Sequence, residues 1–171
     1  MITIALGLLV ARLLVGLGFM VHGSQKLFGW FGGYGPDGTG QFFEGLGFRP
    51  GVLFAVSAGL GEFVGGLLIA LGFLGVVGPA LIVMVMIVAM LTVHIKNGFL
   101  ATNNGWELNG AYIASALAFA FGGFGAYSLD GLVGLTAFSG PIVASAGMAA
   151  AVVLALLNVA VRRPVNQASK S

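Results

Sequence analysis

Long apolar stretches constrain this chain more than any other feature of its sequence. Five of them are close to the ~20 residues that a helix needs to cross the ~30 Å hydrocarbon core of a bilayer. They are residues 2–22, 51–71, 76–96, 108–124 and 141–161. Only 7% of the 171 residues are charged, whereas a soluble domain has about 25%. The sequence therefore predicts an all-α polytopic membrane helix bundle, with a four-helix core and a fifth C-terminal transmembrane helix.

Missing residue types and patterns exclude several classes of protein. The chain has no cysteine, which rules out disulfides, thiolate metal sites and CxxC redox chemistry. Its net charge of +2 comes from scattered residues, and no basic patch indicates nucleic-acid binding. The first apolar stretch lacks a basic leading region and contains Arg12, so we interpret it as a membrane span and not as a cleavable signal peptide.

The predicted spans divide the chain into two parts. Residues 1–130 are expected to form the core, and residues 23–50, rich in glycine and aromatic residues, to form an interfacial loop at headgroup level. Residues 131–171 would add the extra helix, at about 141–161, and a short basic tail. Small residues recur in this helix and are typical of close helix contacts, so it is expected to serve packing or homo-oligomerisation.

Lysine and arginine in the loops predict the orientation of the chain. With five spans, all of these residues fall on one side, and none falls on the side that holds the N-terminus. The positive-inside rule then places the N-terminus outside and the C-terminus in the cytoplasm. The residues are Lys26, Arg49, Lys96, Arg162, Arg163 and Lys170.

Arg12 and Glu62 each interrupt an apolar stretch. A charge at mid-bilayer costs at least ~2.5–3.5 kcal/mol on translocon scales, so it is normally paired or functional. Counting from the start of each span places both residues ~15–16 Å deep on antiparallel helices. The sequence thus predicts a structural ion pair between Arg12 and Glu62. Whether Glu62 also transfers protons, or the pair only fixes helix register, stays open.

A second polar group gathers at one end of the predicted bundle. His22 and Lys26 are four residues apart and share a helix face, and His94 closes the third span, which runs parallel to the first. The candidate catalytic residues are Glu62, His22 and His94. The candidate substrate-binding residues are Gln25, Lys26, Trp30, Asn104 and Glu107.

Two kinds of ligand could use such a polar group. Two histidines without cysteine or an HxxxH spacing are too few for a convincing metal or haem site, so no metal site is expected. A quinone needs only a few hydrogen-bond donors facing an aromatic-lined pocket. The residues at hand suit a quinone better, while the cofactor itself stays undetermined.

Several short motifs follow one another in a recognisable order. They are RLLVGLGF from Arg12, HGSQKLFGWFGG from His22, GTGQFF from Gly38, EFVGG from Glu62, VHIKNGF from Val93, NGWE from Asn104 and YSLD from Tyr127. Through these motifs, over roughly residues 12–130, the chain resembles the DoxX family of small bacterial membrane proteins. The fifth span lies outside this resemblance.

The resemblance implies a multi-pass protein of the bacterial inner (plasma) membrane. Members of the family are similar to subunits of quinol oxidase or thiosulfate:quinone oxidoreductase, or are linked to oxidative stress. It implies an oxidoreductase subunit that acts with a redox partner, and it points to His22, Gln25, Lys26, Glu62, His94, Asn104 and Glu107. Two other functions stay open. One is a small transporter or permeability module, and the other is a non-catalytic assembly subunit of a membrane complex.

Overall fold

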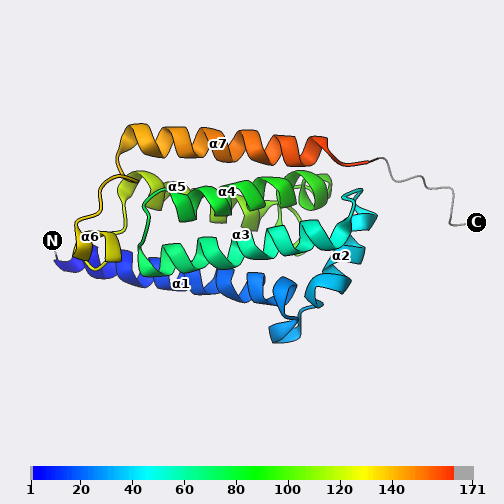
Figure 1. Ribbon diagram of the computed structural model, residues 1–171, viewed down its shortest axis with the longest axis horizontal. Coiled ribbons are helices and arrows are strands. Elements are labelled where there is room, and N and C mark those ends of the chain that lie inside the picture. Colours follow the sequence, from blue (N-terminus) through cyan, green and yellow to red (C-terminus); the bar gives the residue numbers. More distant parts are fainter. Residues whose placement is uncertain (1, 164–171) are drawn as a thin grey trace, which may run out of the picture.

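The computed structural model describes residues 2–163, and this part of the chain is helical, without β-strands. The long α-helices run side by side along one direction, and the described chain starts at one end of the bundle and ends at the other (Figure 1). They are α1 (Ile2–Leu27), α2 (Gly35–Gly45), α3 (Gly51–Leu71), α4 (Val77–Ala89), α5 (Glu107–Gly122), α6 (Leu129–Val133) and α7 (Pro141–Ala160). The predicted all-α bundle is confirmed.

Four helical segments of the described chain are long and apolar enough to cross a membrane. They are α1, α3, α7 and the continuous segment Val77–Asn97, in which a π-helical turn (Met90–His94) extends α4. The second and fifth predicted spans match α3 and α7 closely. The fourth predicted span, 108–124, corresponds to α5, which has only 16 residues, is ~24 Å long and is not among these four segments.

Glycines bring α1 and α3 into backbone contact. A Cβ atom on Gly16 would lie 2.5 Å from the carbonyl oxygen of Gly66, and one on Gly23 would lie 2.6 Å from the backbone nitrogen of Phe63. Such close approach between membrane helices requires small residues. These contacts set the antiparallel register of the two helices, on which the position of every polar group on α1 depends.

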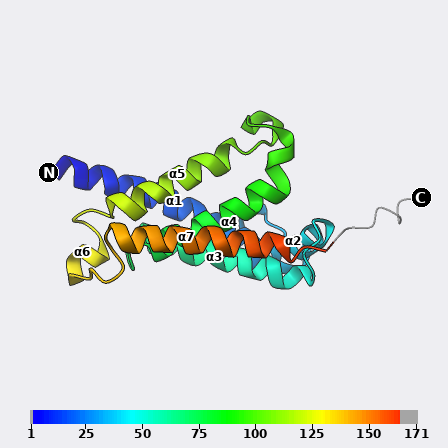
Figure 2. The same cartoon turned by 90° about the horizontal axis from the view of Figure 1, so that it is seen from above.

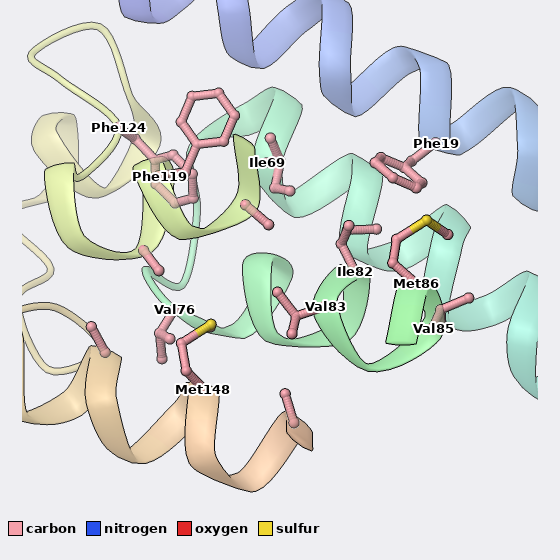
Figure 3. Packing of buried hydrophobic residues seen from close by; sticks show 14 residues of the cluster. Phe19, Ile69, Val76, Ile82, Val83, Val85, Met86, Phe119, Phe124 and Met148 are labelled. Carbon is pink, nitrogen blue, oxygen red and sulfur yellow. The ribbon is translucent and has the colours of Figure 1, made fainter. Parts of the chain in front are cut away.

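An apolar core joins α1, α3, α4, α5 and α7. Phe19, Ile69 and Ile82 are almost completely buried in it, and Met148 of α7 lies in the same cluster (Figure 3). α7 therefore packs against α4 as part of the same bundle. The division of the chain at residue 130 stays a prediction.

The basic tail after α7 contacts the turn between α2 and α3. Arg162 donates from Nε to the Leu46 carbonyl oxygen at 2.7 Å, and its guanidinium lies 5.6 Å from the centre of the Phe48 ring. The backbone N–H of Arg163 donates to the Gly47 carbonyl oxygen at 2.8 Å. These contacts hold the C-terminal end of α7 against α2. Lys170 lies outside the described residues.

The opposite end of the bundle is closed by α6. The Asp130 carboxylate accepts the backbone N–H groups of Leu74 and Gly75, at 3.0 and 2.8 Å, in the turn between α3 and α4. Ser128 caps α6 by accepting the N–H of Gly131 at 3.1 Å. A buried carboxylate thus satisfies two donors that a tight turn would otherwise leave unpaired.

Candidate functional site

The predicted ion pair between Arg12 and Glu62 is wrong. Arg12 is buried against Gly72, at the α6 end of the bundle, and donates from Nη2 to the Tyr127 carbonyl oxygen. Glu62 lies ten residues from Gly72 along α3, which separates the two levels by ~15 Å.

The error comes from helix register. α1 continues to Leu27, past the expected end at residue 22, so α1 and α3 do not start and stop at the same depths. Counting from the predicted span ends placed Arg12 too far into the bundle. The contacts of Gly16 and Gly23 with α3 fix a register in which Glu62 lies beside the C-terminal part of α1.

Glu62 instead pairs with Lys26. The Lys26 Nζ atom lies 2.6 Å from Glu62 Oε2, with the Glu62 side chain 5% exposed and the Lys26 side chain 23% exposed. Lys26 sits in the last turn of α1, so this contact joins α1 to α3. A charge-assisted hydrogen bond of this length is among the stronger polar contacts in proteins.

A cavity of about 550 Å³ surrounds this pair. It lies at the end of the bundle where the connection from α4 to α5 stands away from α3 and α7 (Figure 2). Its walls come from α1, α2, α3, α4, α5 and α7. The predicted site residues that line it are Glu62, Lys26, His22, His94 and Asn104.

The other three predicted site residues do not line the cavity. Gln25 Oε1 lies 3.2 Å from His22 Nδ1, while Gln25 Nε2 donates to the Phe31 carbonyl oxygen. Trp30 packs on Phe28, with ring centres 4.8 Å apart. Glu107 accepts the N–H of Ala101 at 2.8 Å. These residues shape the loops around the cavity, and their proposed contact with substrate stays untested.

Both histidines of the cavity are oriented by neighbours. His94 closes the π-helical turn, and its Nδ1 lies 2.9 Å from the Asn104 carbonyl oxygen, an acceptor. In the neutral ring, Nδ1 then carries the proton and Nε2 is left as an acceptor. The contact of His22 Nδ1 with Gln25 Oε1 selects the same form of His22. π-helical turns occur often at functional sites.

Sequence reasoning missed five polar residues of the cavity wall, which are Ser57, Thr92, Asn109, Tyr112 and Asn158. Asn109 is 6% exposed, and its Nδ2 donates only to the Met86 sulfur, at 3.6 Å. Tyr112 follows three residues later on α5, and its ring meets the Phe19 ring edge-on at 4.8 Å. Their spacing on an apolar helix was the signal that could have found them, because such residues share one face.

The lining combines one ion pair with a mostly apolar surface. One cation and one anion face the cavity, together with neutral amide, hydroxyl and imidazole groups. Apart from these, the walls are aliphatic and aromatic, including Phe19, Phe42, Phe43, Phe48 and Phe54. Among residues 2–163, no group of three or more His, Cys, Asp and Glu side chains is placed to hold a metal ion. Such a cavity suits an uncharged, largely apolar molecule with a few polar atoms.

The long apolar helices define a multi-pass helical membrane protein. Residues 7–95, just over half of the chain, match the family model named DoxX. The chain therefore belongs to the DoxX family. No curated protein and no solved structure matches it. The matched residues include α1 to α4 and His94, whereas the cavity walls from α5 and α7 lie beyond them.

Proposed function

We propose that this protein binds a quinone or quinol in the cavity and acts as a redox subunit in the bacterial inner membrane. The observation that carries the proposal is the buried Lys26–Glu62 pair in the wall of an apolar cavity of about 550 Å³. Ligand cavities in proteins commonly measure roughly 300–1,000 Å³. The likeness of DoxX proteins to quinol-oxidising subunits supports the same choice.

The lining supports this ligand class by its chemistry. A quinone ring is flat and apolar, with oxygen atoms on opposite sides. Phe19 and Tyr112 offer flat aromatic surface, and Lys26 offers a charged donor that is already held in position by Glu62. Uncommitted donors and acceptors in an apolar pocket fix the orientation of a ligand.

Glu62 and His22 account for proton movement in the proposal. A quinol that is oxidised gives up both hydroxyl protons and its electrons. The Glu62 carboxylate accepts the two hydroxyl protons one after the other, and His22, which is exposed at the rim of the cavity, passes each of them to water. The electrons go to an acceptor on a partner subunit. The chain thus holds and deprotonates the quinol, and the partner completes its oxidation.

Binding of a short-chain ubiquinol, kept reduced, to the purified protein in lipid nanodiscs tests the proposal. A hydrogen bond to a charged group contributes about 1.5–3 kcal/mol, so Glu62→Gln is expected to weaken binding by about tenfold to 100-fold. His22→Ala is expected to slow ubiquinol-dependent turnover in membranes that hold the partner. Ser115→Ala, on α5 and outside the cavity lining, is the control and is expected to bind as the wild type does.

Wild-type affinity in Glu62→Gln, together with wild-type turnover in His22→Ala, would remove the site from this cavity. A carrier for a small apolar or weakly acidic solute is the second candidate, because a charged pair beside a cavity within membrane helices also suits a transport pathway. Solute flux through proteoliposomes that contain this chain and no redox partner would favour the carrier.

A further inference from the structure

We propose that Asn158 of α7 is a ligand-binding and specificity-determining residue of the cavity. α7 would then be a wall of the binding site and not only a packing helix. The choice of a quinol as the ligand rests on the proposed function, whereas the placement of Asn158 in the cavity wall does not.

Asn158 stands out within its own helix. α7 has 20 residues, and its only other polar side chain is Ser145. Asn158 is half-buried and lines the cavity, and within residues 2–163 its side chain forms no hydrogen bond with protein atoms. An accessible amide at the wall of an apolar cavity can hydrogen-bond to water or to a ligand. A ligand in the cavity would supply the missing partner.

Asn158 and the Lys26–Glu62 pair line the same cavity. Met84 and Met86 both line it, although residues two apart on an α-helix point about 200° apart. Met86 marks the side of α4 that faces α5, because its sulfur accepts a hydrogen bond from Asn109. The cavity therefore extends around α4, from the α5 side to the side opposite.

The end of α7 is held against the cavity wall. Arg162 follows the end of α7, four residues beyond Asn158, and it bonds to the Leu46 carbonyl oxygen and lies over the Phe48 ring. Leu46 and Phe48 themselves line the cavity. The same contacts that fasten α7 thus keep Asn158 turned toward the ligand.

These observations assign separate contacts to separate parts of the ligand. Lys26 and Glu62 bind one oxygen atom of the quinol, and the Asn158 amide binds a second polar atom, either the other ring oxygen or a ring substituent. Asn158 lies outside the matched residues 7–95. Discrimination among quinols by their ring substituents would therefore reside in the C-terminal part of this chain.

Affinity measurements with Asn158→Leu test the contact. Leucine is similar in size and cannot hydrogen-bond, so affinity for the short-chain ubiquinol is expected to fall about fivefold to tenfold. Ser145→Ala, on the exposed part of the same helix, is expected to leave affinity unchanged. Unchanged affinity in Asn158→Leu, measured in a folded protein that binds ubiquinol, would overturn the assignment while leaving the proposed function intact.

Cysteine labelling gives a readout that does not depend on the ligand. The chain contains no cysteine, so Asn158→Cys and Leu157→Cys each introduce a single thiol. A small water-soluble thiosulfonate is expected to modify Asn158→Cys through the cavity and to leave Leu157→Cys, whose native side chain is 57% exposed on the outer face, unmodified in lipid. Ubiquinol is expected to protect Asn158→Cys.

Equal resistance of both thiols would overturn the placement of Asn158 in the cavity. A wild-type protein that binds no ubiquinol, yet whose Asn158→Cys variant is modified, would contradict the proposed function and uphold the placement. The two failures are therefore distinguishable.

Discussion

Lys26 and Glu62 depend on each other at the scale of single residues. Their contact at 2.6 Å places a carboxylate with a 5% exposed side chain beside its only charged partner within the described residues. Removing one member of such a pair leaves the other charge without compensation, whereas removing both leaves an apolar contact. The stability of the protein should therefore respond differently to single and double substitutions.

We expect Lys26→Met to be less stable than the double variant Lys26→Met/Glu62→Gln. Because Lys26 is partly exposed, the single substitution is expected to cost about 2–3 kcal/mol, below the cost of breaking a fully buried pair. Unfolding in detergent with increasing denaturant, followed by circular dichroism, measures the difference. A double variant as unstable as the single one would show that the pair is not the source of the effect.

The sequence indicated which charged residues would be buried, but not which of them would form an ion pair. Arg12 and Glu62 were expected to pair because each lies near the middle of its apolar stretch. Hydropathy does not report the offset between neighbouring helices, which the glycine contacts of α1 and α3 decide. His22, Lys26 and His94 were expected at the same end of the bundle, and all three line the cavity. This expectation needed only the direction in which each helix runs.

Glycine spacing governs packing at the scale of the helices. On α1, Gly16 faces the backbone of α3, whereas Gly18 has no atom within 4 Å of the position its Cβ would occupy. The two glycines are chemically identical and only two residues apart. A substitution at Gly16 therefore changes the packing of α1 on α3, whereas a substitution at Gly18 changes only the helix propensity of α1.

We expect Gly16→Ala to destabilise the bundle and Gly18→Ala to leave it unchanged or slightly more stable. A methyl group on Gly16 would force α1 and α3 apart, which costs about 1–3 kcal/mol for an overpacked contact. Alanine at an exposed helical position gains about 0.5–1 kcal/mol over glycine. Thermal unfolding of both variants in the same detergent gives the comparison. The opposite order would refute the backbone contact between α1 and α3.

Helix boundaries were predictable where glycine or proline marks them. α3 begins directly after Pro50 and ends before Gly72, and α7 begins at Pro141, as the sequence predicted. α1 extended further than expected because the residues after His22 stay helical through Leu27, which brings Lys26 against Glu62 of α3. The wall from α5 was missed because Asn109 and Tyr112 carry no charge. The wall from α7 was missed because that helix was assigned to packing or homo-oligomerisation.

At the scale of the whole molecule, the two ends of the bundle differ in structure: one end contains the cavity, and the other contains the turn that Asp130 stabilises. The cavity and the described lysine and arginine residues of the loops lie at one end, whereas Asp130 fastens the turn between α3 and α4 at the other. A perturbation at the Asp130 end should change stability without reaching the ligand.

We expect Asp130→Asn to lower the free energy of unfolding by about 1–3 kcal/mol, because an amide oxygen replaces a carboxylate that accepts two backbone N–H groups. Ubiquinol affinity is expected to stay at the wild-type value. The exposed Asp37 of α2 provides the control, since Asp37→Asn should have a smaller effect on unfolding. A loss of affinity in folded Asp130→Asn would show that the two ends are coupled.

The short length of α5 has a consequence for the surrounding lipid. With 16 residues, α5 falls ~6 Å short of a ~30 Å hydrocarbon core, and a span with such a hydrophobic mismatch is accommodated by local thinning of the bilayer. Headgroups and water then sink toward the flank of the protein formed by α5, which carries Asn109 and Tyr112. In the proposed function, α5 would thereby shorten the distance that protons travel between Glu62 and the aqueous phase.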